Sequence, residues 1–82
     1  MRYRVDVNIM PKAEIADPQG QTVEGALPRI GFAGMSEVRV GKRVSLVVEA
    51  DKPEAARDRV QKACEKFLAN PIIEDFEIQL HE

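Results

Sequence analysis

The sequence contains few of the residues on which catalytic and metal sites are usually built. Its 82 residues include one cysteine, Cys64, and one histidine, His81. A single cysteine excludes an internal disulfide, and no set of zinc ligands is visible around either residue. We therefore expect Cys64 to be a small apolar side chain inside a helix, and His81 to lie on an open sheet face without a catalytic or metal role.

Excess basic charge and long apolar runs are also missing. The formal net charge is −2 and the isoelectric point is about 5.4, which disfavours nucleic acid as the main partner. No apolar run approaches the roughly 18 residues that cross a membrane. The first residues alternate polar and apolar, unlike a signal peptide. These features predict a cytoplasmic protein with no membrane contact.

The length predicts one domain, residues 1–82, with a thin core. A domain of this size buries only about 60–65% of the surface that its unfolded chain exposes. We therefore expect the chain to associate with itself as a dimer or tetramer.

Periodicity predicts a strand at each end of the chain. Apolar residues alternate with polar ones over residues 2–9 and again over residues 75–81, which is typical of half-buried strands. The residue before Pro71 is unfavourable for helix, so the last strand is expected to follow a break at Asn70-Pro71.

Two helices are expected between these strands. Asp17 and Pro18 fit an N-cap and a first helical position, and the apolar face that follows is Val23, Ala26, Leu27 and Ile30. Pro28 lies inside this helix and should disturb its last turn. The second helix should begin with a capping box of Asp51 and Glu54 and carry an apolar stripe of Ala56, Val60, Ala63, Cys64 and Phe67.

Residues 36–49 are predicted to form a hairpin. A loop of Gly41, Lys42 and Arg43 pairs Val40 with Val44 and Val38 with Leu46, which puts the apolar side chains on one face. The resulting order is β-α-β-β-α-β. We therefore predict an α+β two-layer sandwich, in which both helices cover one face of a four-stranded antiparallel sheet, on a ferredoxin-like plan. The other face is either solvated or meets a second copy.

Three segments are candidate contact sites, each with a purely structural explanation as well. Asp17-Pro18-Gln19-Gly20 is an exposed loop or a helix cap. Gly41-Lys42, with Arg39 and Arg43, is a basic patch or an ordinary turn; it lacks the further glycines of a phosphate-binding loop. Glu74 and Asp75 are neighbours on a strand and point to opposite faces, so they do not form one acid–base pair.

Taken from end to end, several short strings resemble one family. These are Asp17-Pro18-Gln19-Gly20, Val23, Ala26-Leu27, Val38-Arg39, Gly41-Lys42, Cys64-Glu65-Lys66 and residues 68–76, from Leu68 through Asn70-Pro71 and Glu74-Asp75 to Phe76. In this order and at this length they are similar to PurS, the small subunit of phosphoribosylformylglycinamidine synthase. Pro28 and Phe32-Ala33-Gly34 depart from the family pattern at the end of the first helix.

The resemblance implies a subunit without catalytic residues in a ligase of de novo purine biosynthesis. In that enzyme a PurQ glutaminase subunit releases ammonia from glutamine, and a PurL synthetase subunit uses ATP and Mg to add it to the amide substrate. The small subunit would join the two and assist ammonia transfer, binding no cofactor itself. The contact candidates are then Asp17, Pro18, Gln19, Gly20, Arg39, Gly41, Lys42, Asn70, Glu74 and Asp75.

Other functions remain possible on the sequence alone. The main alternative is a regulatory module of ferredoxin-like architecture that binds a small molecule. An acylphosphatase-like hydrolase would need an arginine in a phosphate-cradling loop, which Pro11-Lys12-Ala13-Glu14 does not supply. An RNA-recognition module is disfavoured by the acidity and the scarcity of aromatic residues.

Overall fold

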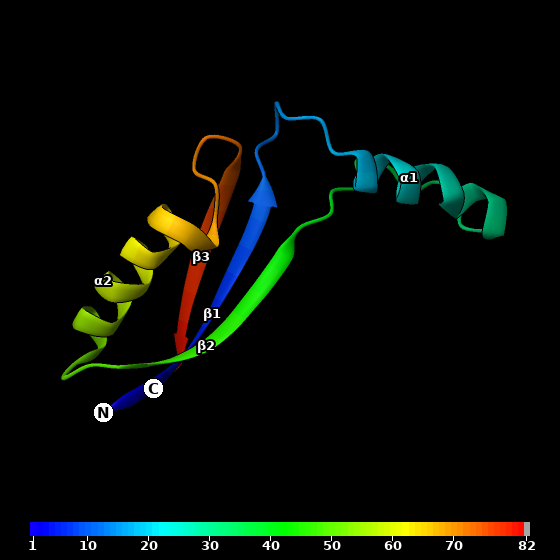
Figure 1. The fold of residues 1–82 in the computed structure, drawn as a ribbon. Helices are drawn as coiled ribbons and strands as arrows, with labels where there is room; N and C mark the ends of the chain where they lie inside the picture. Colours follow the sequence, from blue (N-terminus) through cyan, green and yellow to red (C-terminus); the bar gives the residue numbers. More distant parts are fainter. Residues whose placement is uncertain (82) are drawn as a thin grey trace.

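The computed structural model describes residues 1–81 and contains a three-stranded antiparallel sheet in the order β2-β1-β3. Its strands are β1 (Arg2–Pro11), β2 (Lys42–Glu49) and β3 (Glu74–His81). Its helices are α1 (Pro18–Ala26) with a 3₁₀ turn at Leu27–Ile30, and α2 (Pro53–Ala63), which continues as a π-helical turn at Cys64–Leu68. Figure 1 shows the sheet and α2 as one body, from which α1 projects as a separate arm.

The core lies between α2 and the sheet. Tyr3, Val5, Val7 and Ile9 of the central strand β1 are almost wholly buried, as their alternation predicts. They pack against Ala56, Val60 and Cys64 on the inner side of α2 and its π-helical extension; half-buried apolar residues of β2 and β3 complete the cluster. The burial of Cys64 confirms its predicted place in the apolar stripe.

The prediction of a four-stranded sheet is wrong. Residues 36–41 are not a strand, and β2 pairs with β1 instead, with Val7 opposite Val44 and Val5 opposite Leu46. The predicted hairpin fails because the backbone N–H groups of Val38 and Val40 donate to side chains of the arm, Glu24 Oε1 and Asp17 Oδ2, rather than to β2. Residues 12–41 thus form a long connection between two paired strands.

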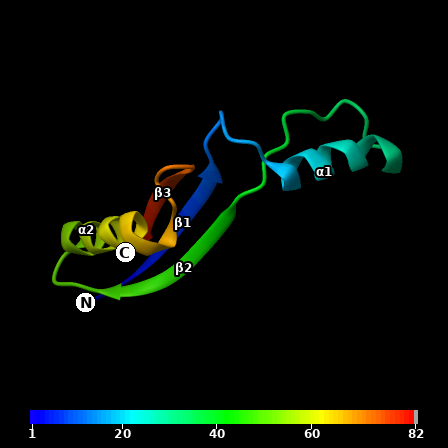
Figure 2. The same ribbon diagram turned by 45° about the horizontal axis from the view of Figure 1, so that its top comes forward.

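The prediction that both helices cover one sheet face is also wrong. Of the helices in residues 1–81, only α2 lies over the sheet. The arm extends away from the sheet in both ribbon views (Figures 1 and 2), and the longest axis of the molecule measures 51 Å. Pro28 has the predicted effect on the first helix, because the α-helix gives way to 3₁₀ geometry from Leu27.

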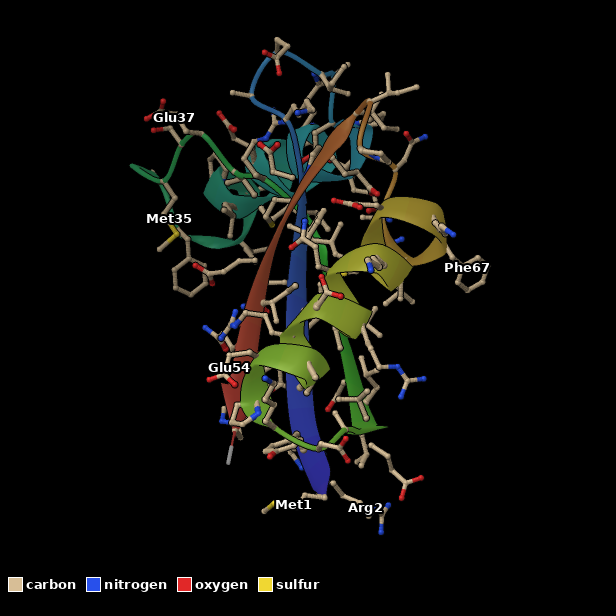
Figure 3. The ribbon with its side chains drawn as sticks, turned by 90° about the vertical axis from the view of Figure 1, so that its left-hand side faces the viewer. Met1, Arg2, Met35, Glu37, Glu54 and Phe67 are labelled. Carbon is tan, nitrogen blue, oxygen red and sulfur yellow. The ribbon has the colours of Figure 1, made fainter. Side chains whose placement is uncertain are left out.

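Two local predictions for the second helix need correction. Its N-cap is Lys52, which makes no side-chain capping bond. Asp51 and Glu54 do not form a capping box, because the helix begins one residue later than that motif requires. The π-helical turn then adds a residue to the repeat. Leu68 turns toward the core, and Phe67, predicted to be buried, is 86% exposed and points into solvent (Figure 3).

Candidate partner-contact site

The base of the arm is the place where most of the candidate residues meet. The end of β1, the start of α1, the segment that leads into β2 and the start of β3 converge there. We call this region the arm root: Lys12, Asp17, Gln19, Gly20, Arg39, Gly41, Lys42, Glu74 and Asp75.

Asp17 is the central residue of the arm root. Its side chain is nearly buried, with 6% of the residue exposed. Oδ1 accepts the backbone N–H of Gly20 at 3.1 Å, which caps α1 as the sequence predicts. Oδ2 accepts the backbone N–H of Val40 at 2.8 Å, a hydrogen bond that the sequence pattern does not predict.

The electrostatics of Asp17 follow from these bonds. The N–H groups of Val40 and Gly20 favour the charged carboxylate and lower its pKa below the ordinary value; the positive charge of Arg39, 3.9 Å away at Nε, adds to the effect. A carboxylate held in its charged form by backbone donors is a structural clamp, and a poor proton shuttle at neutral pH.

Arg39 fastens the other side of the arm root. Its guanidinium donates to the carbonyl oxygen of Lys12 at 2.8 Å and to that of Ile15 at 3.1 Å. These carbonyls belong to the loop between β1 and α1, so one side chain ties the outgoing and the returning halves of the connection together. The observed role of Arg39 is therefore structural, on a side chain that remains about a third exposed.

Two glycines are required here by close approach. A Cβ on Gly20 would collide with the backbone oxygen of Val38, and a Cβ on Gly41 would collide with the backbone oxygen of Ile9. Both positions therefore let the returning segment run directly against α1 and β1.

The two neighbouring acidic residues at the start of the last strand, Glu74 and Asp75, have different roles. Glu74 is half-buried, and its Oε1 accepts the backbone N–H of Asn70 at 2.8 Å, which closes the turn into β3. Asp75 is exposed and its Oδ1 lies 3.0 Å from Lys12 Nζ. As predicted, the two carboxylates do not share a site. Asn70 itself serves the turn, because its Oδ1 accepts the N–H of Ile72.

The exposed part of the arm root is concave and mixed in charge. Gln19, Gly41, Lys42 and Glu74 line a depression of about 210 Å³. A larger one of about 640 Å³ lies beside it, with Arg39, Asp75, Glu24 and Glu37 on its walls. Pro18 is exposed at the first turn of α1. Such a surface suits contact with another protein chain, with ion pairs at its rim.

Sequence reasoning missed three contributors to this region. Lys12 forms an ion pair with Asp75, and Glu24 accepts the backbone N–H of Val38. Both contacts join residues that are distant in the sequence, so no local motif predicts them. Glu37 has a positive φ of 56°, a conformation that side chains other than glycine rarely adopt. Figure 3 shows it in the loop that returns from the arm, near Met35.

A second polar cluster, also missed, lies on the open face of the sheet. Asp6 Oδ2 is 2.6 Å from an Arg43 guanidinium nitrogen and 2.8 Å from His81 Nε2, so one carboxylate links all three strands. Hydrogen bonds from Arg43, Ser45 and His81 lower the Asp6 pKa to about 2. His81, the last residue of β3, therefore contributes to the contacts that join the strands.

Within residues 1–81 no cluster of three or more metal-ligating side chains occurs. No helix in that range is long and apolar enough to span a membrane.

Comparison with known proteins assigns the family. Residues 4–82 match the family described as PurS: Phosphoribosylformylglycinamidine (FGAM) synthase. Among relatives, the PurS subunit of Mycobacterium leprae is 46% identical over 77 residues, covering 92% of this chain and 91% of that protein. The PurS subunit of Methanocaldococcus jannaschii is 34% identical over 80 residues, covering 98% and 96%.

Solved structures agree with these relatives. The crystal structure of the PurS subunit of Thermotoga maritima (EC 6.3.5.3) superposes with a TM-score of 0.91 at 31% identity, covering 99% of this chain and 93% of that one. A chain in the structure of PurLQS from the same organism gives a TM-score of 0.91 at 31% identity, with 99% of both chains covered. This chain belongs to the PurS family, the small subunit of phosphoribosylformylglycinamidine synthase.

Proposed function

We propose that this chain is the bridging subunit of a phosphoribosylformylglycinamidine synthase. It would hold a PurQ-type glutaminase and a PurL-type synthetase together and assist the passage of ammonia between them. The observation that carries the proposal is the likeness along nearly the full chain to a protein solved as part of PurLQS. ATP and Mg would be used by the synthetase, in the cytoplasm, and this chain would bind neither.

The chemistry of ammonia explains why such a bridge is useful. In water at neutral pH ammonia is mostly ammonium, which has no lone pair for attack on an activated amide. Two sites held together, with water excluded between them, keep the neutral form available and raise its effective concentration at the acceptor. A subunit with this task needs shaped surfaces rather than a nucleophile or a base.

We further propose the arm root as the surface that meets these partners. It gathers residues from four separate segments into one concave region, and its shape is fixed by the bonds of Asp17 and Arg39. Lys42 and Asp75 are exposed there, while Asp17, Gly20 and Asn70 serve mainly to build the surface. Lys42, Asp75, Pro18 and Gln19 are thus the candidates for direct contact.

Assembly of the complex tests the bridge directly. The chain is mixed with the glutaminase and synthetase subunits of the same organism, with glutamine and ATP present, and the mass of the assembly is measured by light scattering after gel filtration. We expect one species that contains all three chains, and none that joins the two larger subunits when this chain is left out. A stable complex of the two larger subunits alone would contradict the proposal.

The regulatory-module alternative predicts a different result. A small-molecule ligand would raise the melting temperature of the isolated chain. The match to the PurS family favours the bridging function over this one.

A further inference from the structure

The connection between α2 and β3 exposes two large apolar side chains. Phe67, in the π-helical turn, is 86% exposed, and Ile72, in the turn before β3, is 80% exposed. Figure 3 shows the Phe67 ring pointing away from the body of the molecule. Scattered apolar residues are ordinary on protein surfaces, but two in one short connection form a site of the kind that marks protein contacts. We call Phe67 and Ile72 the α2–β3 patch.

The backbone that carries the α2–β3 patch is fixed by hydrogen bonds. The N–H of Ala69 donates to the carbonyl oxygen of Cys64 at 3.1 Å, which closes the π-helical turn, and both of these residues are buried. The side-chain oxygen of Asn70 accepts the N–H of Ile72 at 3.1 Å. The patch is therefore held in one arrangement before a partner arrives, which lowers the entropic cost of binding.

The core of this chain does not use Phe67. A regular α-helix would turn Phe67 toward the side of Val60 and Cys64, but the π-helical turn brings Leu68 to the core in its place. Such turns occur frequently at functional sites. Aromatic side chains are enriched at the centres of protein interfaces, because they bury a large area in a defined geometry. The Phe67 ring is thus available to enter a pocket on another protein.

The α2–β3 patch lies at the end of the sheet from which the arm leaves. In Figure 1 the end of α2 and the turn into β3 stand at that end. The N–H of Lys12, in the arm root, donates to the carbonyl oxygen of Ile73, in the turn, at 2.9 Å. Patch and arm root are thus neighbours of different character, one apolar and the other charged. A bridge needs two such surfaces, and ammonia transfer requires its two partners to be close together.

The apolar character of the patch favours a partner that stays bound. Exposed apolar patches promote non-specific association of a free chain, and permanent interfaces are more apolar than transient ones. Glutamine that is hydrolysed while no acceptor is ready is wasted, so reversible docking suits the glutaminase. The synthetase, which holds the acceptor, is then the permanent companion of this chain.

We infer that the α2–β3 patch anchors this chain to the synthetase-type subunit, with Phe67 and Ile72 inserted into an apolar pocket on that subunit. The inference rests on the proposed bridging function and names the partner that this surface meets. It leaves the charged arm root free to face the glutaminase-type subunit beside it. The π-helical turn then has a function, because it presents an aromatic ring to the partner at no cost to the core.

The test measures the affinity of the synthetase subunit of the same organism for the full-length chain, by biolayer interferometry with this chain immobilised. We expect Phe67→Asp and Ile72→Asp each to weaken binding at least about tenfold. Phe67→Leu keeps an apolar side chain and should change the dissociation constant by less than about threefold. Gln61→Asp is the matched control, since it adds the same charge at an exposed position of α2 outside the patch.

The outcomes separate this inference from the bridging function. Unchanged binding of the synthetase by Phe67→Asp, or an equal loss of binding by Gln61→Asp, would overturn the inference and leave the bridging function intact. A wild-type chain that binds neither larger subunit, separately or together, would overturn both.

A cross-link identifies the partner even if a variant unfolds. The photoreactive residue p-benzoylphenylalanine replaces Phe67, and the labelled chain is assembled with both larger subunits in the presence of glutamine and ATP before irradiation. Mass spectrometry should find the cross-links on the synthetase subunit. Cross-links to the glutaminase subunit, or to a second copy of this chain, would overturn the inference.

Discussion

The carboxylate of Asp17 accepts the backbone N–H of Val40, 23 residues further along the chain, at 2.8 Å. The same carboxylate caps α1 through Gly20. Together with the bond from the Val38 N–H to Glu24, this side chain holds residues 38–40 against the arm rather than beside β2.

Substitutions at Gly20 and Gly25 should have opposite effects on stability. Both glycines lie in α1, but a Cβ on Gly20 meets the backbone of Val38, while one on Gly25 meets nothing within 4 Å. We expect Gly20→Ala to cost about 1–3 kcal/mol through steric overlap. Gly25→Ala should stabilise the protein by about 0.5–1 kcal/mol, because alanine loses less conformational entropy than glycine in a helix and the new Cβ meets no other atom. Urea unfolding measures both; equal effects would mean that the returning segment does not lie against α1.

Truncation to alanine should affect the free energy of unfolding very differently at Ile9 and at Phe67. Ile9 is wholly buried in β1, and truncation to alanine should cost about 2–5 kcal/mol. Phe67→Ala should change the free energy of unfolding by less than about 0.5 kcal/mol, because the π-helical turn holds the ring in solvent. A large loss for Phe67→Ala would show that α2 continues as a regular helix with Phe67 in the core.

Asp6 should make the stability of the sheet sensitive to acid. Its pKa is lowered from 3.8 to about 2 by Arg43, Ser45 and His81. Because the folded state holds the carboxylate charged more strongly than the unfolded state, the stabilisation is complete above the unfolded pKa and is lost as pH falls toward about 2. Asp6→Asn should remove this part of the pH dependence. The measurement is urea unfolding of both proteins between pH 6 and pH 2, with NMR titration of the Asp6 carboxyl carbon as an independent check; a midpoint near 3.8 would contradict the cross-strand cluster.

The exposed charges of the arm root should matter for coupling between the two larger subunits. Charge reversal of Lys42 and Asp75 together, Lys42→Glu with Asp75→Lys, should lower glutamine-dependent turnover of the reconstituted enzyme at least tenfold and spare turnover with added ammonia. Lys52→Glu with Asp51→Lys is the control, since both residues are exposed at the opposite end of the sheet, before α2. Loss of coupling in the control alone would place the partner surface there instead.

The sequence was sufficient for those parts of the fold that depend on local patterns. Alternation over β1 and β3, the cap at Asp17 and the break at Asn70-Pro71 each depend on near neighbours, and all appear in the structure. The pairing of β2 was not predictable in this way. Val38 and Val40 alternate as well as Val44 and Leu46 do, and the choice between them depends on distant acceptors, Glu24 and Asp17.

The grouping of the candidate contact residues also depends on contacts between distant parts of the chain. Their clustering follows from the topology, which places the starts of β2 and β3 on either side of the end of β1. Short strings in the sequence do not reveal this arrangement. Phe67 is exposed because of one π-helical turn. A hydrophobic pattern with a period of 3.6 residues assumes a regular α-helix and cannot predict such a turn.

The central claim is that this chain couples ammonia release to ammonia use, and the ratio of two rates tests it. Product formation by the glutaminase and synthetase subunits is measured with glutamine and, separately, with ammonium chloride, while this chain is added in increasing amounts. We predict that the glutamine-driven rate rises from near background to a plateau at stoichiometric addition, while the ammonia-driven rate changes little. A glutamine-driven rate that is the same with and without the chain would contradict the account.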